Sequence, residues 1–276
     1  MSHTMTGYIA DRSWAGEGRR LSALESALDP NTIRHLLRIG VKEGWRCLEI
    51  GAGEGSIAAW MAATVGREGM VVATDSNARP LAELARRFAN LTVREEDVSV
   101  GVSPCSGDHG FDVAHARLVL GHVRDRQQAL RNVIGRLRPG GWLIVEDTDF
   151  MWLQSGEQPI FPESRREPYF RVWRAVAQYM YQRGYDLYWG RNVAGALCQA
   201  GLCEVGGEAA LPIGSRPLAL AMAMTIERFG DAVVSTGAVT EAELQGCLAD
   251  LRAPDTVFTG SPTFSVWGRR PERATQ

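Results

Sequence analysis

The stretch Arg46-Cys47-Leu48-Glu49-Ile50-Gly51-Ala52-Gly53-Glu54-Gly55-Ser56 decides the fold. A short, mostly apolar run ends in three alternating glycines, and an apolar helical pattern follows over residues 57–65. A strand, a glycine turn and a helix in this order are typical of a doubly wound α/β domain, which binds nucleotide-like ligands at the carboxyl end of its first strand. Glycine permits a tight turn and a close approach of ligand to the backbone, because it has no Cβ. We therefore expect this turn to bind the ligand and the rest of the chain to support or cover it.

Apolar runs and helical patterns alternate around the turn. We expect strands over residues 46–50, 70–74, 91–94, 111–114, 142–145, 204–212 and 263–267. We expect helices over residues 17–28, 30–39, 57–65, 78–88, 126–137, 169–183, 192–200, 218–229 and 241–251. Asp29 and Pro30 are typical of a helix start, so they separate the first two helices. Strands that alternate with helices at this spacing predict a parallel sheet.

The composition excludes several classes of protein. The 276 residues are 45% hydrophobic and 22% charged, with a formal net charge of −2, which suits one large domain or one domain with an elaborate insertion. The balanced charge gives no electrostatic footprint for nucleic acid, and no apolar run reaches the ~20 residues that a membrane span needs. The five cysteines form no CxxC pair. We therefore expect reduced thiols, a cytoplasmic protein and no metal site.

Three acidic residues are expected at the ends of three successive strands. Glu49 lies in the first strand, Asp75 ends the second and Asp97 follows the third. Asp75 suits the two ribose hydroxyls and Asp97 suits the exocyclic amine of adenine, whereas Glu49 would repel a pyrophosphate and attract a cation. Ser56 stands where a dinucleotide-binding turn has its third glycine. These residues predict a phosphate-free, cationic ligand that contains adenosine.

Five motifs then occur in order over roughly residues 30–150: EIGAGEG at 49–55, Asp75, EDV at 96–98, FDV at 111–113 and LRPGGW at 137–142. In this order they resemble the motifs of class I S-adenosylmethionine-dependent methyltransferases, of the small-molecule branch found in bacterial natural-product pathways. The resemblance implies an α/β, Rossmann-like fold: a seven-stranded, mostly parallel sheet with helices on both faces. It also implies S-adenosyl-L-methionine as the cofactor and S-adenosyl-L-homocysteine as the product.

The resemblance assigns a cofactor-binding set. Asp75 would hold the ribose, Asp97 and Val98 would frame the adenine, and the backbone near Gly51 and Ala116 would hold the methionine end. The whole predicted set is Tyr8, Glu49, Gly51, Gly53, Asp75, Ser76, Asp97, Val98 and Ala116. Tyr8 belongs to it if the N-terminal arm folds over the ligand; alternatively, Tyr8 and Trp14 only anchor a loose terminus.

The segment after Asp149 is rich in aromatic residues, with Pro159 and Pro162 among them. We expect a helical aromatic lid inserted after the fifth strand, in which Trp152, Trp173 and Tyr185 bind the substrate and the Tyr181 phenol acts as a weak acid or base. The alternative is a packing or dimer-forming unit. The expected domains are 1–40, an arm with helices over the cofactor; 41–150, the cofactor-binding core; 151–200, the lid; and 201–276, which completes the same domain.

Candidates for catalysis and for acceptor contacts follow the fourth and fifth strands. Methyl transfer requires alignment of the acceptor with the S–CH3 bond, and a neutral oxygen or nitrogen acceptor also needs a base. In related sugar and indole-product methyltransferases the positions of His122 and Asp147 resemble active-site residues, so we predict both to be catalytic. His115 and Arg117 are predicted to contact the substrate.

Each of these four residues has a structural alternative. His122 would only satisfy local backbone, Asp147 would pair with Arg117, and His115 would face the other side of the sheet. A fixed cation beside a sulfonium is unfavourable unless a carboxylate offsets it. We therefore expect Arg117 to pair with an acid or to bind an acidic group of the substrate.

These features predict methyl transfer to an aromatic or apolar small molecule in secondary metabolism, with an indole carbon as the preferred acceptor. O- and N-methylation of another natural product stay open. Two alternatives come from other classes: a nicotinamide-dependent reductase, which Ser56 and Glu49 disfavour, and a non-methylating cyclase or binding protein that retains the cofactor site. We expect neither a nucleic acid nor a membrane as partner, and we leave a homodimer open.

Overall fold

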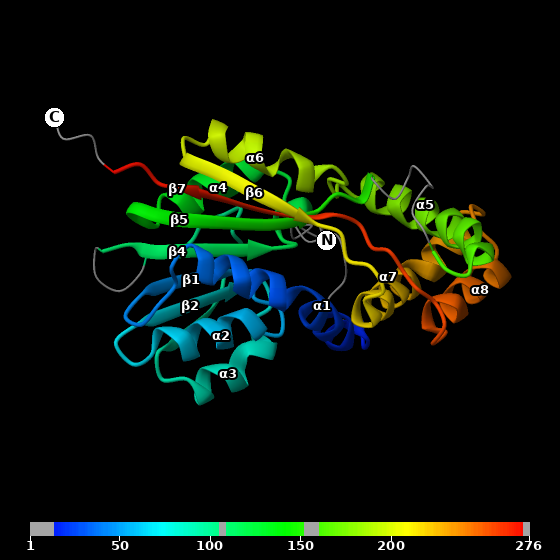
Figure 1. The fold of residues 1–276 in the computed structure, drawn as a ribbon, viewed down its shortest axis with the longest axis horizontal. Helices are drawn as coiled ribbons and strands as arrows, with labels where there is room; N and C mark the ends of the chain where they lie inside the picture. Colours follow the sequence, from blue (N-terminus) through cyan, green and yellow to red (C-terminus); the bar gives the residue numbers. More distant parts are fainter. Residues whose placement is uncertain (1–13, 105–108, 152–159, 273–276) are drawn as a thin grey trace, which may run out of the picture.

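The computed structural model describes residues 14–104, 109–151 and 160–272. Within them, seven strands form one sheet in the order β3-β2-β1-β4-β5-β7-β6 (Figure 1). The first five strands pair in parallel, and β7 runs antiparallel to both of its neighbours. This confirms the predicted seven-stranded, mostly parallel sheet. The strands are β1 (Arg46–Ile50), β2 (Met70–Asp75), β3 (Leu91–Glu95), β4 (Phe111–Arg117), β5 (Leu137–Thr148), β6 (Cys203–Ala210) and β7 (Thr263–Arg269).

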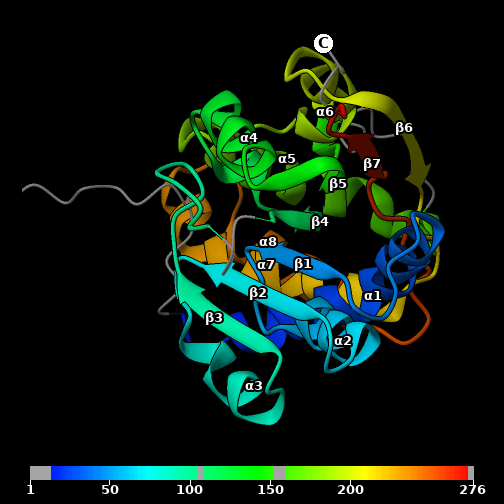
Figure 2. The same cartoon turned by 90° about the vertical axis from the view of Figure 1, so that its left-hand side faces the viewer.

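Helices cover both faces of the sheet, as predicted. The C-terminal half of α1 and all of α2 pack on one face, and α4 and α6 pack on the other (Figure 2). No helix among the described residues is both long enough and apolar enough to cross a membrane. The helices are α1 (Glu17–Arg38), α2 (Ser56–Val65), α3 (Ala82–Arg87), α4 (Arg126–Ile134), α5 (Arg166–Gln182), α6 (Trp189–Gln199), α7 (Arg216–Ser235) and α8 (Glu241–Arg252), with short 3-10 helices η1 (Arg79–Leu81), η2 (Leu120–His122) and η4 (Glu163–Arg165).

Burial on both faces explains why β1 is almost continuously apolar. Leu48 and Ile50 face the α4 and α6 layer, whereas Cys47 faces α1 and α2. A parallel sheet with helices on both sides has no solvent-facing side, so its central strands do not alternate between apolar and polar residues. Glu49 is the exception, because it is charged and only 4% exposed. Glu49 also lines a cavity at the carboxyl end of β1.

A third layer of helices lies beyond the carboxyl ends of the strands. It consists of α5, α7 and α8, which share a hydrophobic core of their own (Figure 1). By contrast, α6 packs against the sheet. The segment expected as a lid, 151–200, is therefore divided between two layers, and much of the helical cover comes from residues after β6.

The predicted break between residues 17–28 and 30–39 is absent, because α1 runs through Pro30 as one helix. Proline removes an N–H from the helix interior, which normally ends or kinks a helix. The Asp29 side chain does not cap a new helix here. It accepts hydrogen bonds from Arg117 and Ser56 instead. These tertiary contacts of Asp29 hold α1 in place immediately before the proline.

The helix predicted over residues 126–137 ends earlier, at Ile134, and β5 begins at Leu137. The residues Pro139, Gly140 and Gly141 therefore lie inside the strand, at a register shift opposite β4. A Cβ on Gly141 would lie 2.8 Å from the Phe111 carbonyl oxygen. The glycine lets the two strands stay paired across the irregularity.

Candidate active site

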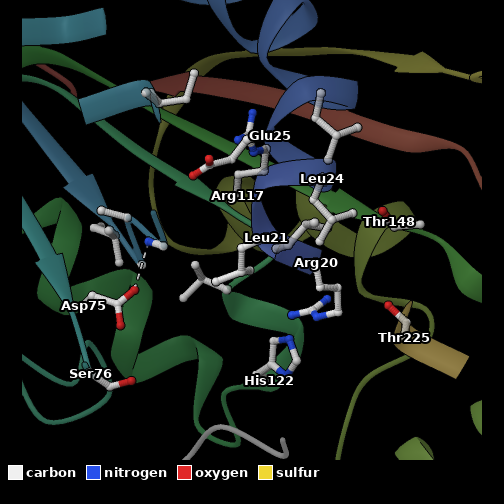
Figure 3. Close-up of a pocket in the computed structure, with 18 of the residues that line it drawn as sticks. Arg20, Leu21, Leu24, Glu25, Asp75, Ser76, Arg117, His122, Thr148 and Thr225 are labelled. Carbon is white, nitrogen blue, oxygen red and sulfur yellow. Dashed lines mark hydrogen bonds between the residues drawn. The ribbon is translucent and has the colours of Figure 1, made fainter. Parts of the chain in front are cut away.

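A cavity of about 430 Å³ lies at the carboxyl ends of the parallel strands, between the sheet and the helical third layer. Its walls come from α1, from the loops after β1 to β5, from α7 and from residues 260–263. Figure 3 shows Asp75 and Ser76 on one side, Thr148 and Thr225 on the other, and Arg20 and His122 between them. The cavity therefore has two ends, one formed by the glycine turn and its acids and the other mainly by helices.

The glycine turn has the backbone that the sequence predicted. Gly51 and Gly53 have φ values of 64° and 61°, a region that residues with a side chain rarely adopt. A Cβ on Gly51 would lie 2.2 Å from the Val119 side chain, so this residue has to be small. A Cβ on Gly53 would meet nothing closer than 3.7 Å and would project toward Glu25 and Leu21, both of which line the cavity. A ligand can therefore approach the Gly53 backbone closely.

The predicted acids converge on this end of the cavity. Asp75 is 1% exposed, and its carboxylate accepts hydrogen bonds from the backbone N–H groups of Gly53 (3.1 Å) and Asn77 (2.8 Å). Asp97 accepts hydrogen bonds from the N–H and hydroxyl of Ser99. The cavity lining includes most of the predicted cofactor set: Glu49, Gly51, Gly53, Asp75, Ser76, Asp97 and Val98.

Ala116, whose backbone was predicted to lie near the methionine end, does not itself line the cavity. Its side chain is 2% exposed and packs in the core on the α4 and α6 side of the sheet. The next two residues, Arg117 and Leu118, line the cavity instead. Tyr8 and Trp152 lie outside the described residues, so the structure gives no position for either.

The N-terminus of α2 is already occupied by acids of the protein. The Glu25 carboxylate accepts a hydrogen bond from the Ser56 N–H (3.5 Å), and the Asp29 carboxylate accepts one from the Ser56 hydroxyl (3.1 Å). Burial and the charge of Asp29 raise the pKa of Glu25, although the Ser56 N–H opposes this shift. A helix N-terminus attracts a phosphate because its N–H groups lack partners. Carboxylates placed here disfavour a phosphate-bearing ligand.

His115 does not reach the cavity, which corrects its predicted role as a substrate contact. Its ring is fully buried on the α1 face of the sheet, between Glu49 and Glu146. Nδ1 lies 2.7 Å from Glu49 Oε2, and Nε2 lies 3.3 Å from Glu146 Oε2. Side chains on adjacent parallel strands at matching register point to the same face, and Glu49, His115 and Ile144 are aligned in this way. The structural alternative for His115 is therefore correct.

The charge of this cluster follows from its geometry. Burial lowers the pKa of His115, but the carboxylates of Glu49 and Glu146 outweigh it and raise that pKa to about 9. Burial raises the pKa of Glu146, and hydrogen bonds from His115 and His35 more than reverse this, so it ends well below its usual range. His115 is thus an imidazolium that holds the cavity-lining Glu49 in place.

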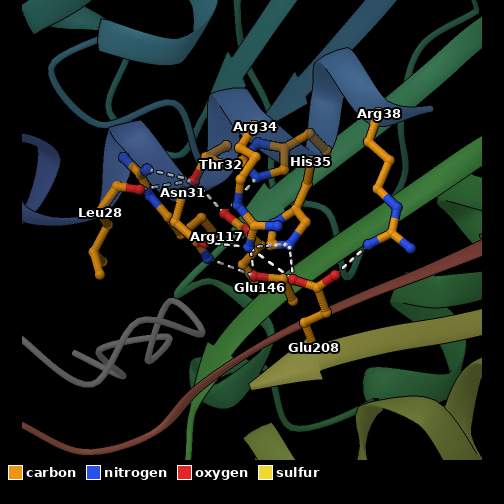
Figure 4. Close-up of polar contacts among 11 residues, drawn as sticks. Leu28, Asn31, Thr32, Arg34, His35, Arg38, Arg117, Glu146 and Glu208 are labelled. Atoms are coloured by element: carbon orange, nitrogen blue, oxygen red, sulfur yellow. Dashed lines mark hydrogen bonds and ion pairs between the residues drawn. The ribbon is translucent and has the colours of Figure 1, made fainter. Parts of the chain in front are cut away.

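The same cluster connects the sheet to α1. Glu146 accepts hydrogen bonds from Thr32 and from the Ser265 hydroxyl (2.6 Å), and His35 Nδ1 lies 3.3 Å from its Oε1 (Figure 4). The other His35 nitrogen lies 3.4 Å from Glu208 on β6. Because α1 also forms one wall of the cavity, this network fixes that wall relative to the strands.

Arg117 lines the cavity and is paired with an acid, as expected. Its Nη2 donates to Asp29 Oδ1 (2.7 Å), and its Nη1 donates to the Thr32 hydroxyl (2.8 Å). The partner is Asp29 and not Asp147, so the predicted alternative of an Arg117–Asp147 pair is wrong. The Asp29 carboxylate offsets the guanidinium charge beside the cavity.

His122 and Tyr185 form a second polar group at the cavity wall. Both residues line the cavity, and their rings meet edge to face with centroids 4.7 Å apart. The Tyr185 hydroxyl lies 3.4 Å from Asp147 Oδ1. A Cβ on Gly121 would lie 2.9 Å from the Tyr185 ring, so a glycine before His122 lets the two rings approach.

Asp147 lies behind this pair and does not line the cavity. It is fully buried and accepts hydrogen bonds from the N–H groups of Gly121 (3.2 Å) and Thr148 (2.9 Å). Burial raises the pKa of Asp147 to about 7, against the opposing effect of these hydrogen bonds. The prediction that Asp147 acts directly on the substrate is therefore wrong, and its contacts orient the Gly121–His122 turn and Tyr185.

Two aromatic predictions are also wrong. Trp173 is fully buried within the third layer and contacts Phe150, with ring centroids 5.2 Å apart, so it supports a cavity residue without lining the cavity. Tyr181 is 56% exposed and points away from the cavity lining. Only one face of α5 is turned inward, and the sequence spacing placed Tyr181 on the wrong face.

Sequence reasoning expected helices of residues 1–40 over the cofactor, but it missed α7 as a cavity wall and the arginines that α1 and α7 contribute. Arg20 from α1 and Arg228 from α7 both line the cavity and both bind the buried carboxylate of Glu17. Burial raises the pKa of Glu17, but hydrogen bonds and charge from the two arginines lower it overall. Glu17 and Arg20 are three residues apart on α1, and this spacing was the one local signal available. The residues described here contain no group of three or more His, Cys, Asp or Glu side chains placed to hold a metal ion.

Comparison with known proteins matches part of the chain to a family of protein domains. Residues 48–143 match the family described as a methyltransferase domain. A curated relative, methyltransferase str2 of Strobilurus tenacellus, is 34% identical over 153 residues, which are 54% of this chain and 50% of the relative. The chain spans about half the length of these curated relatives, of which a second is methyltransferase str3 of the same organism.

Solved structures share the fold at low identity. The [4+2]-cyclase SpnF superposes with a TM-score of 0.57 and 16% identity, over 90% of this chain and 82% of that chain. Phosphoethanolamine N-methyltransferase 2 of Haemonchus contortus, solved with phosphomonomethylethanolamine and S-adenosylhomocysteine, gives 0.54 and 18% identity, over 96% of this chain and 55% of that chain. By this match the chain carries a segment similar to a methyltransferase domain, and its strand order and its superposition on the solved structures show the same fold.

Proposed function

We propose that this chain binds S-adenosyl-L-methionine and transfers its methyl group to a small aromatic or apolar molecule. One observation carries the proposal: a buried acid ends β2 at a glycine turn, while carboxylates of the protein occupy the N-terminus of α2. A ribose donates two hydroxyls to such an acid. A pyrophosphate would need the helix end that Glu25 and Asp29 already hold. The observation favours a phosphate-free nucleoside over a nicotinamide dinucleotide.

The residues of the cavity fit this cofactor. Asp75 would hold the ribose, Asp97 and Val98 would bind the adenine, and the open backbone at Gly53 would lie against the chain that joins ribose to methionine. When bound, S-adenosylmethionine supplies an electrophilic methyl group on a positively charged sulfur. Glu49 favours that positive charge at this end of the cavity, because His115 fixes its carboxylate.

The acceptor would bind at the helical end, where α5, α7 and α1 exclude water and provide an apolar wall. An imidazole nitrogen of His122 is positioned to take a proton from an oxygen or nitrogen acceptor. Tyr185 packs edge to face against that imidazole, and Asp147 orients both through Gly121 and the Tyr185 hydroxyl. We retain an indole-type carbon as the preferred acceptor atom and a role in secondary metabolism, with O- and N-methylation as alternatives.

A non-methylating activity is a second candidate, because the fold alone also supports a [4+2]-cyclase. The test begins with calorimetric titration of S-adenosylmethionine and, separately, of NADPH. The wild type should bind the former and not the latter; the reverse result would refute the proposal. A screen of indoles, phenols and apolar amines should then release S-adenosylhomocysteine with at least one of them.

His122 provides the matched test of chemistry. We expect His122→Ala to lower turnover of an oxygen or nitrogen acceptor by about 10²–10⁴-fold, the usual contribution of a general base. Cofactor affinity should not change, because Asp75 and the glycine turn are untouched. Equal turnover would remove His122 as the base. Bound cofactor with no S-adenosylhomocysteine formed from any acceptor would favour the cyclase or binding-protein alternative.

A further inference from the structure

The helical end of the cavity contains a buried hydroxyl group to which the proposed chemistry gives no role. Ser261 lies between α8 and β7, lines the cavity and is 7% exposed. Its Oγ makes no hydrogen bond to any other part of the chain that the structure describes. A buried hydroxyl is unfavourable unless it is paired. Because Ser261 lines the cavity, a ligand bound there can supply the partner that this hydroxyl lacks.

The backbone around Ser261 is held firmly on both sides. The Gly260 N–H donates to the Pro212 carbonyl (2.9 Å), and the Pro262 carbonyl accepts from the Asp149 N–H (3.0 Å). A Cβ on Gly260 would lie 2.4 Å from the Leu218 side chain, so α7 packs directly on this segment. Ser261 thus has a fixed position at the end of β5, where an acceptor would approach the cofactor.

The threonine hydroxyls that line this end of the cavity already have hydrogen-bond partners. Thr148 and Thr263 pair with each other across β5 and β7 (3.4 Å), and the Thr225 hydroxyl donates to the Ala221 carbonyl of its own helix (2.8 Å). Thr148 and Thr225 lie on the same side of the cavity in Figure 3. The surrounding wall is apolar and consists of Leu24, Phe150, Met180, Leu218, Met222 and Phe229. Ser261 therefore offers a single directed O–H group within an apolar surface.

We propose that Ser261 donates a hydrogen bond to a carbonyl oxygen of an otherwise apolar acceptor, and so selects acceptors that carry a ketone, amide or carboxyl group. A hydroxyl can donate to a carbonyl oxygen. The guanidinium groups of Arg20 and Arg228 line the same cavity. Their positive charge favours a methyl acceptor that presents an oxygen atom over one that presents a cationic amine. The inference rests on the proposed function, since it assigns this end of the cavity to the methyl acceptor.

Two probes of nearly equal shape test the proposal. 2-Acetylnaphthalene carries a carbonyl oxygen where 2-isopropenylnaphthalene carries a CH2 group. Each is titrated calorimetrically into the full chain saturated with S-adenosylhomocysteine, which confines the probe to the helical end. The wild type should bind the ketone more tightly than the alkene, and Ser261→Ala should weaken ketone binding by roughly five- to tenfold, as expected for one neutral hydrogen bond. Alkene binding should stay unchanged.

Thr225→Val is the matched control, because it removes a cavity hydroxyl whose proton is already donated to Ala221. It should leave the preference for the ketone intact. Equal binding of the two probes by the wild type, no binding of either, or a ketone affinity that Ser261→Ala changes less than twofold would overturn the proposal. If S-adenosylhomocysteine does not bind, the proposed function fails. The same titrations without it then still decide whether Ser261 recognises a carbonyl.

Discussion

Removal of the His115 imidazolium should expose how strongly the buried charge cluster stabilises the fold. His115→Gln keeps a polar side chain but removes the positive charge between Glu49 and Glu146. Two carboxylates, 4% and 1% exposed, would then face each other without a cation. Breaking a buried ion pair by removing one partner costs about 3–5 kcal/mol, because a charge is left uncompensated.

The pKa of His115 gives a second value for the stability that the variant should lose. An imidazole with an unperturbed pKa of about 6.5 reaches about 9 in the folded chain. Because one pKa unit corresponds to about 1.36 kcal/mol, this increase corresponds to about 3 kcal/mol of stability. At about 2–4 °C per kcal/mol for a domain of this size, the variant should unfold roughly 6–12 °C below the wild type at about pH 6.

The pH dependence has a definite sign. Folding raises the pKa of His115, so its stabilisation is complete below the unfolded pKa of about 6.5 and is lost as the pH rises through about 9. The difference in Tm between wild type and His115→Gln should therefore narrow between pH 7 and pH 10. Scanning calorimetry at four or five pH values measures it.

A double variant keeps the test specific. In His115→Gln with Glu49→Gln, one of the two carboxylates is neutral, so part of the lost stability should return. Parallel Tm curves for wild type and His115→Gln across this pH range would contradict the reasoning. So would a double variant less stable than the single one.

Three further substitutions test the cofactor end of the cavity and the packing of α5. Asp75→Ala should weaken S-adenosylmethionine binding by about 1–3 kcal/mol, and an unchanged calorimetric Kd would defeat the ribose assignment. Trp173→Ala should lower the free energy of unfolding by about 3–5 kcal/mol, because its ring is fully buried. Tyr181→Ala, at a 56% exposed position near the end of α5, should change the free energy of unfolding by less than about 0.5 kcal/mol. Similar urea midpoints for the two variants would contradict these assignments.

The candidate active-site cavity lies between two structural units whose cavity-lining residues differ in chemistry. The sheet and its glycine turn supply the acids that face a nucleoside, and the third layer supplies an apolar wall with a few directed polar groups. A methyl donor bound at the first unit leaves the second to choose the acceptor. Changes at Ser261 should therefore alter acceptor preference, whereas changes at Asp75 should alter cofactor affinity.

The sequence by itself determined the sheet and the cofactor end of the site. Strand, turn and helix signals are local, so residues 46–56 were enough to predict a strand, a tight glycine turn and a helix in that order. The carboxyl ends of parallel strands meet at one edge of the sheet, so the sequence alone predicts that Glu49, Asp75 and Asp97 lie close together. The same reasoning predicted an acid beside Arg117, since a cation near a sulfonium needs one.

Only the tertiary structure decided which side chains face the cavity beyond that edge. The third layer combines α5, α7 and α8 across the intervening β6, and no local pattern encodes such long-range packing. Helical spacing indicated that α5 has an inward face, but not which turn of it reaches the cavity, so Trp173 became core and Tyr181 became surface. Likewise, the strand alternation left two possible faces for His115. The glycine turn could be predicted because its backbone requirement is local. The helical end of the cavity could not, because it depends on contacts between segments far apart in the chain.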